Sequence, residues 1–322
     1  MPAIEILSPA DNTVFDIAPG TAATGAQMPV IRAEARVTGV TPDSTPTAIF
    51  TWTVSIKFQC SDCTNGKTRE INDEFRLTTH GGVCAIHFPR VRGGLLTISA
   101  AVNLPSGCFE KGTKGLRIRG INPPRQEVNR ACGDQWLQKM VLQESRRRQF
   151  AADPETGASN CPLFSGDRLG GVGLLQITVP KPTDDEHWNW KANIERGMQI
   201  LNEKRNIARQ YPAQVRASHG FQDLLRRFNA GRNPPAVIQL PDFTPVQLEM
   251  DAVRGYNGWA GRDAFGLPLH EFRVPVDAQG NLRVTINASH HGVIEWEQVP
   301  AADRPQNTGD PNYVRNVERQ TP

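Results

Sequence analysis

Three short stretches of the chain combine residue types that can cut a sugar polymer. Glu144 is followed by Ser145 near the end of a predicted helix, a glycine-rich turn with a glutamine comes later, and a tyrosine–asparagine pair closes the series. A carboxyl group can protonate a departing oxygen, an amide can bind sugar hydroxyls, and a phenol can orient the acid. The set predicts Glu144 as the catalytic residue. The predicted substrate-binding residues are Ser145, Gly173, Leu174, Gln176, Ile177, Tyr256 and Asn257.

The acid must keep its proton near neutral pH to cleave a glycosidic bond. Burial against apolar groups raises a carboxyl pKa and makes this feasible. Glu144 follows the apolar residues Met140, Val141 and Leu142, so the sequence places it at the edge of a helix that faces a cleft. An isolated helix glutamate is more often a solvated surface residue. The prediction therefore depends on the whole ordered set.

This set resembles the soluble lytic transglycosylase group of the lysozyme superfamily, which includes goose-type lysozyme relatives. Glu144-Ser145 matches the family's Glu-Ser pair, and GVGLLQIT matches its Gly-Leu-Met-Gln segment with Leu175 in place of methionine. RGYNG matches the Ala-Tyr-Asn motif, with Gly255 where alanine is usual. WKANIERGMQIL resembles the family's Asn-Ile-x-x-Gly helix, and DPNYVRNV resembles its terminal Tyr-Val helix. The similar region covers roughly residues 128 to 319.

The resemblance implies a lytic transglycosylase that needs one glutamate, no metal and no cofactor. Glu144 would protonate the oxygen between N-acetylmuramic acid and N-acetylglucosamine, then accept a proton from the muramic acid 6-hydroxyl and leave a 1,6-anhydro end. Most glycosidases use two carboxylates instead. A phage-type muramidase that hydrolyses the bond is the alternative, with Asp153 or Asp167 positioning the water. A non-catalytic wall-binding or spike component is the alternative of another class. RRFNAGRN, with Phe228-Asn229, is a competing match to the Tyr-Asn motif.

The fold class expected is two-domain: an all-β immunoglobulin-like sandwich over residues 1–122 and a mainly α, lysozyme-like α+β domain over 123–322 with an inserted β-hairpin. Alternating apolar residues predict the strands, and one-face apolar spacing predicts the helices. Asn122-Pro123-Pro124 reads as the linker. Strands are predicted at 30–37, 50–56, 84–88 and 95–102, helices at 128–150, 192–211, 221–228, 245–256 and 312–318, and a hairpin over 272–296 around a turn at 277–281.

The cysteines favour disulfides. Cys132 and Cys161 lie on either side of the Glu144 helix. A disulfide between them would close a loop and stabilise the fold by roughly 3 kcal/mol. The other four, Cys60, Cys63, Cys84 and Cys108, lie in the β region and are read as two disulfides or a zinc site. A zinc ribbon usually has two close Cys pairs, and only one pair is close here, so disulfides are favoured.

Composition bounds the partners and the location. The chain has 322 residues, 38% hydrophobic and 21% charged, with a net charge of +3 that is too small to indicate nucleic acid. No secretory signal and no membrane-spanning stretch is recognisable, so membrane insertion is not expected. With the even cysteine count, these features predict export without a signal peptide. The protein is expected to act in the periplasm or cell wall of a target bacterium, or to be associated with a phage. An effector of type VI secretion would bring two partners besides peptidoglycan, an immunity protein and a secretion-spike protein.

Overall fold

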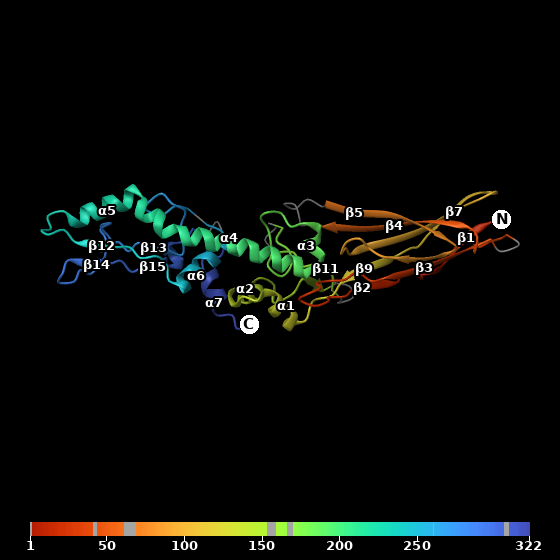
Figure 1. Ribbon diagram of the computed structural model, residues 1–322, viewed down its shortest axis with the longest axis horizontal. Helices are drawn as coiled ribbons and strands as arrows, with labels where there is room; N and C mark the ends of the chain where they lie inside the picture. Colours follow the sequence, from red (N-terminus) through yellow and green to blue (C-terminus); the bar gives the residue numbers. More distant parts are fainter. Residues whose placement is uncertain are drawn as a thin grey trace. The chain divides into compact units, whose positions relative to one another are not determined.

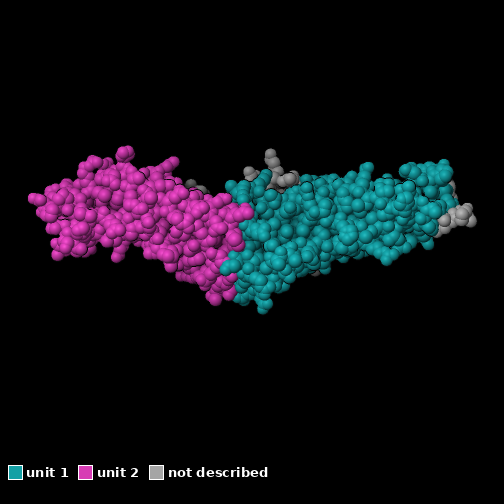
Figure 2. All heavy atoms as spheres, viewed as in Figure 1, with its two compact units in different colours: residues 1–133, 144–196 teal, residues 134–143, 197–322 magenta. Residues whose placement is uncertain are grey.

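A computed structural model describes residues 2–40, 44–60, 69–152, 159–165, 170–259, 261–305 and 309–322 of the chain. The described residues have mixed α and β content, with several separate sheets. Two compact units are distinguished in Figure 2. Unit 1 contains residues 1–133 and 144–196, and unit 2 contains residues 134–143 and 197–322.

Unit 1 begins with two β-sheets, drawn in red to yellow in Figure 1. One has the strand order β1-β3-β6, and the other has the order β2-β9-β7-β4-β5 with β8 paired to β7. β1 lies close to β7 and β8, and β5 lies close to β6, so the two sheets face each other. The strands are β1 (Ala3–Ser8), β2 (Val14–Ile17), β3 (Ile31–Thr38), β4 (Ile49–Cys60), β5 (Arg69–His80), β6 (Val83–Ile86), β7 (Gly94–Leu104), β8 (Gly107–Gly112) and β9 (Leu116–Gly120).

Alternation of side chains explains why these segments form strands. Every second residue of β3 is buried, beginning at Ile31, and the same period runs through β4 and β7. Trp52 lies at the centre of this core, and its indole N–H donates to Thr79 Oγ1 at 2.9 Å. The strands predicted at 30–37, 50–56, 84–88 and 95–102 are confirmed as β3, β4, β6 and β7. Two facing sheets with a shared apolar core fit the expected sandwich, whose immunoglobulin-like character stays a prediction.

The helix predicted over 128–150 is wrong in its extent. The chain forms α1 and α2 there, separated by Gly133, whose φ of 62° is a left-handed conformation that ends a helix. Arg146 and Arg147 end α2 in the same way, with φ values of 54° and 62°. The following elements of the chain are a short antiparallel pair and two helices. The bounds are α1 (Arg125–Cys132), α2 (Gln135–Ser145), β10 (Phe150–Ala152), β11 (Ser159–Pro162), α3 (Asp184–Trp188) and α4 (Trp190–Ala217).

Unit 1 does not stop at the expected boundary after residue 122, because the sandwich packs closely against the residues that follow it. The rings of Phe58 and Trp188 meet edge to face, with centroids 5.1 Å apart. A Cβ at Gly93 would lie 2.2 Å from the Trp188 ring, and a Cβ at Gly120 would lie 2.3 Å from the Phe150 ring. Both glycines therefore allow an approach that no larger residue permits. The sandwich and residues 144–196 share one core.

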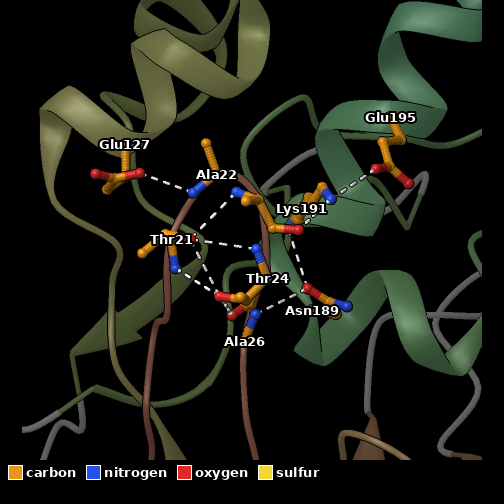
Figure 3. Close-up of polar contacts among 10 residues, drawn as sticks. Thr21, Ala22, Thr24, Ala26, Glu127, Asn189, Lys191 and Glu195 are labelled. Carbon is orange, nitrogen blue, oxygen red and sulfur yellow. Dashed lines mark hydrogen bonds and ion pairs between the residues drawn. The ribbon is translucent and has the colours of Figure 1, made fainter.

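Hydrogen bonds from the loop between β2 and β3 reinforce this contact, as Figure 3 shows. The backbone N–H of Ala22 donates to Glu127 Oε2 of α1 at 2.7 Å. The backbone N–H of Ala26 donates to Asn189 Oδ1 at 3.3 Å, and Lys191 Nζ donates to the carbonyl of Ala23 at 2.9 Å. One loop of the sandwich thus holds α1 and the start of α4.

Unit 2 is mainly helical and contains most of α4, from Gly197 onward. The predicted helices at 192–211, 221–228, 245–256 and 312–318 are confirmed as α4, α5, α6 and α7, although α4 runs on to Ala217. No helix among the described residues has both the length and the apolar content to cross a lipid bilayer. The remaining bounds are α5 (His219–Asn229), β12 (Val237–Gln239), α6 (Pro245–Tyr256), β13 (Phe272–Arg273), β14 (His291–Val293), β15 (Glu297–Gln298), η1 (Ala301–Asp303) and α7 (Tyr313–Glu318).

The hairpin predicted over 272–296 is confirmed only at its turn. Asp277 accepts hydrogen bonds from the N–H groups of Gln279 and Asn281, which closes the turn. The strands pair differently from a simple hairpin: β13 is antiparallel to β15, and β14 is parallel to β12. Apolar alternation therefore located the strands but not their partners.

Buried polar groups hold the core of unit 2 together. The Asp251 carboxylate, fully buried in α6, contacts His270 Nδ1 at 2.7 Å and accepts from the backbone N–H of Glu271 at 2.7 Å. The Tyr211 ring stacks on the His270 ring, with centroids 3.7 Å apart. Glu271 pairs with Arg304 at 2.6 Å. Burial raises the pKa of the Glu271 carboxyl, against the opposing effect of Arg304.

Arg92 joins the sandwich to α3 in unit 1. Its side chain is 6% exposed, and Nη1 lies 3.0 Å from Asp185. Its other nitrogen atoms lie 3.7 Å from Asp73 of β5 and 3.9 Å from Asp184. A buried guanidinium needs such partners, because desolvation of an isolated charge is strongly unfavourable.

We expect Arg92→Met to destabilise unit 1 by about 1–3 kcal/mol, less than for a fully buried ion pair because Asp185 is partly solvated. Thermal unfolding followed by circular dichroism measures the effect. Arg90→Met is the control, since Arg90 is exposed. Equal melting temperatures for the two variants would show that Arg92 does not hold α3.

Candidate functional site

Glu144 lies in the last turn of α2, one residue before the helix ends, and its side chain is half-buried. Ser145 is buried, with 3% exposure, and its carbonyl accepts from the N–H of Arg148 at 3.2 Å. Left-handed backbone at Arg146 and Arg147 costs about 1–2 kcal/mol per residue for non-glycine side chains. Such conformations are kept only where surrounding contacts impose them, and they are common beside functional groups. The chain thus turns away sharply after the predicted acid.

Asn122 fixes the chain just after this turn. Its Oδ1 accepts from the backbone N–H groups of both Gln149 and Phe150, each at 2.8 Å. Its Nδ2 donates to the carbonyl of Phe150 at 3.1 Å. Asn122, which was expected to begin a linker, therefore holds the chain at the start of β10 by hydrogen bonds.

The glycine-rich segment forms a tight turn between Val172 and Ile177. These two residues exchange backbone hydrogen bonds of 3.2 Å, and Gly173 takes a left-handed φ of 74°. Leu174 and Ile177 were predicted to contact substrate, but their side chains are 0% and 1% exposed. They are buried because they anchor the turn in the core, so they are not surfaces for a sugar.

Gln176 is the polar side chain that this turn presents. Its backbone is left-handed, with a φ of 46°, and its side chain is half-buried. Nε2 donates to the carbonyl of Gly173 at 2.8 Å, which folds the amide back over the turn. Among the described residues, none donates a hydrogen bond to Oε1 of Gln176. This oxygen can accept from a ligand N–H or hydroxyl.

Two buried amide side chains form hydrogen bonds with the backbone of the turn. Gln149 Oε1 accepts from the N–H of Leu174 at 3.2 Å. Asn193, at the start of α4, accepts from the N–H of Leu175 at 3.0 Å and donates to the carbonyl of Val172 at 2.9 Å. Asn193 belongs to a motif in the sequence, whereas Gln149 belongs to none. A lone glutamine after three arginines carries no sequence signal of burial.

Tyr256 and Asn257 belong to unit 2, whereas Glu144, Ser145 and Gln176 belong to unit 1. Tyr256 is the last residue of α6 and is half-buried. The Asn257 amide is occupied by a structural contact: Nδ2 donates to the carbonyl of Asp310 at 3.0 Å, and Oδ1 accepts from its N–H at 3.3 Å. Asn257 therefore ties the chain before α7. A ligand role for Tyr256 stays a prediction.

In the competing pair Phe228-Asn229, the asparagine amide also bonds the backbone of a later residue, here at the end of α5. Asn229 accepts from the N–H of Ala236 at 2.8 Å and donates to its carbonyl at 3.1 Å. The Phe228 ring is covered by the guanidinium of Arg232, 4.4 Å from its centroid. Both asparagines are structural, so only the phenol of Tyr256 separates the two matches chemically.

The remaining predicted residues divide into two groups. Asp153 and Asp167, the candidates for positioning water, lie outside the described residues. Cys132 is buried at the end of α1, and Cys161 lies in β11 opposite Ala151. The disulfide predicted between Cys132 and Cys161 is not present in the structure. Asn122 joins β10 to the chain before Glu144 through its hydrogen bonds with Phe150.

Gly173→Ala tests whether the turn depends on its two amide supports. A Cβ at Gly173 would lie 2.5 Å from Gln149 Oε1 and 2.6 Å from Asn193 Nδ2. We expect a loss of about 1–2 kcal/mol from left-handed backbone, plus about 1–3 kcal/mol for each buried hydrogen bond displaced. Denaturant unfolding measures it.

Gly133→Ala is the control for this substitution. Gly133 has a similar φ of 62°, and a Cβ there would meet nothing within 4 Å. The control should carry the backbone cost alone. If both variants lose the same stability, the amide supports do not restrict the turn.

Comparison with known proteins returned no relative: no protein family, curated protein or solved structure matches this chain. The resemblance to soluble lytic transglycosylases therefore rests on the residue motifs.

Proposed function

We propose that the protein is a peptidoglycan-cleaving lytic transglycosylase that acts on the bond between N-acetylmuramic acid and N-acetylglucosamine. The observation that carries this proposal is the connection between the acid and the glutamine turn. Gln149 follows Glu144 by a short, fixed stretch of chain, and its side chain bonds the turn that presents Gln176. The turn that presents Gln176 is thus held by a residue that lies five positions after Glu144 in the chain.

Cleavage requires Glu144 to act twice. Its carboxyl donates a proton to the departing O4 of N-acetylglucosamine while the C1–O4 bond breaks. The carboxylate then takes the proton of the muramic acid 6-hydroxyl as O6 bonds to C1, which closes the 1,6-anhydro ring. The glutamate ends in its starting state, and neither water nor a second carboxylate enters the balance.

Gln176 and Tyr256 are assigned to substrate binding in this proposal. Gln176 Oε1 suits an acetamide N–H or a sugar hydroxyl, since its Nε2 already donates within the turn. Tyr256 offers an aromatic ring that can pack on a sugar face. Leu174 and Ile177 contribute by fixing the turn, and Asn257 by fixing the chain before α7.

Glu144→Gln tests the proposal directly. The substitution keeps the shape of the side chain but removes the transferable proton, so release of muropeptides from purified peptidoglycan should fall by about 10²- to 10⁴-fold. The melting temperature should change little. Mass spectrometry of the products identifies 1,6-anhydro ends for a transglycosylase and reducing ends for a hydrolase.

Glu195→Gln is the control, because Glu195 is an exposed residue of α4 with 58% side-chain exposure. It should digest the wall like the unsubstituted protein. Anhydro products that vanish only in Glu144→Gln support the proposal. A wall left intact by all three proteins would leave the non-catalytic binding role.

A further inference from the structure

Gln149 makes several hydrogen bonds next to the proposed site. It is fully buried, with 0% exposure. Its Oε1 accepts from the N–H of Leu174, and its Nε2 donates to the carbonyls of Glu186 and His187 at 3.0 and 2.9 Å. Its backbone N–H donates to Asn122, and its carbonyl accepts from the N–H of Leu163 at 2.8 Å. One side chain and its backbone connect four segments of unit 1.

The side of Gln149 away from the turn is firmly anchored. Its Nε2 contacts the carbonyls at the end of α3, a helix closed by a capping box in which Thr183 Oγ1 accepts from the N–H of Glu186 and Glu186 Oε2 accepts from the N–H of Thr183. Arg92 of the sandwich bonds α3 through Asp185. Gln149 therefore has a fixed support that extends into the β-sandwich.

The Gln149 side chain and the turn are in close contact. Gly173 approaches so closely that a Cβ would lie 2.5 Å from Gln149 Oε1. The Gln176 amide in turn donates to the carbonyl of Gly173 at 2.8 Å. A displacement of Gln149 is thus passed to Gly173 and then to Gln176.

We propose that Gln149 is a positioning residue of the cleavage reaction, whose side-chain amide holds Gln176 at a fixed place relative to Glu144. This rests on the proposed function. Gln149 is enclosed and acts through Gln176 without contacting substrate. Misplacement of a binding group by about 1 Å can cost about 100-fold in rate. Loss of the amide should lower kcat more than it raises KM, because bound substrate is then poorly aligned.

A double-mutant cycle separates positioning from general support of the fold. Gln149→Met keeps the length of the side chain but removes its hydrogen bonds, and should lower kcat about 10- to 100-fold at temperatures where the variant is folded. In a Gln176→Ala background, the same change should lower the remaining kcat less than about 3-fold, because the residue it acts on is gone. Equal losses in both backgrounds overturn the proposal. Gln210→Met, at an exposed position, is the control.

Hydrogen exchange gives a readout that needs no activity. In Gln149→Met the amide of Leu174 should exchange at least about 10-fold faster, since its acceptor is lost, whereas exchange in the β-sandwich should be unchanged. Unchanged exchange at Leu174 overturns the proposal that Gln149 holds the turn. If Gln149→Met does not fold, Gly173→Ala is used, because a Cβ there would lie 2.5 Å from Gln149 Oε1 and disturbs the same contact, so Leu174 should again exchange faster.

The two proposals fail in different ways. An unsubstituted protein that releases no product from peptidoglycan overturns the proposed function and the catalytic role of Gln149 with it, while exchange at Leu174 still decides whether Gln149 holds the turn. An active protein whose Gln149 and Gln176 losses add independently overturns the positioning role alone.

Discussion

The structure of unit 1 depends on how buried backbone groups are satisfied in the turn from Val172 to Ile177. A turn enclosed in protein cannot give its N–H groups to water, and an unpaired buried amide costs about 1–3 kcal/mol. Gln149 and Asn193 supply the acceptors for Leu174 and Leu175. The same two side chains reach the carbonyls of α3 and Val172, so satisfying the turn also fixes its place.

This requirement explains why the β-sandwich is more than an appended module. α3 is held by Arg92 from the sandwich, and Trp188 at its end fills a space that Gly93 leaves open. The support of the glutamine turn therefore begins in the β-sheets and passes through α3. A division of the chain at the proline pair after Asn122 follows the sequence pattern but cuts through a shared core.

Periodicity predicted the elements whose environment is simple. β3 and β7 have one buried face, and α6 begins at a proline with a capping box. Both the alternation of side chains and the capping residues can be read from neighbouring positions in the sequence. The end of α2 was missed because left-handed arginines are imposed by tertiary contacts, which no propensity describes. The role of Gln149 was missed for a related reason: a buried glutamine has the composition of a surface residue, and only its partners reveal it.

The motif residues show the same limit within the candidate site. The order Glu-Ser, glycine turn and Tyr-Asn is a sequence pattern, and a pattern does not separate exposed side chains from those that are buried or already hydrogen-bonded. Leu174, Ile177 and Asn257 turned out to be support, since their side chains are enclosed or already bonded. Gln176 and Glu144 are half-buried.

The left-handed arginines beside Glu144 have a consequence for engineering. Glycine and asparagine adopt this backbone with little penalty, whereas arginine resists it. Arg146 is exposed, so its replacement by asparagine would relax the corner that follows the acid without touching a sugar-binding group. Residue 146 is therefore a position where backbone strain after Glu144 can be relieved without a change to the carboxyl side chain.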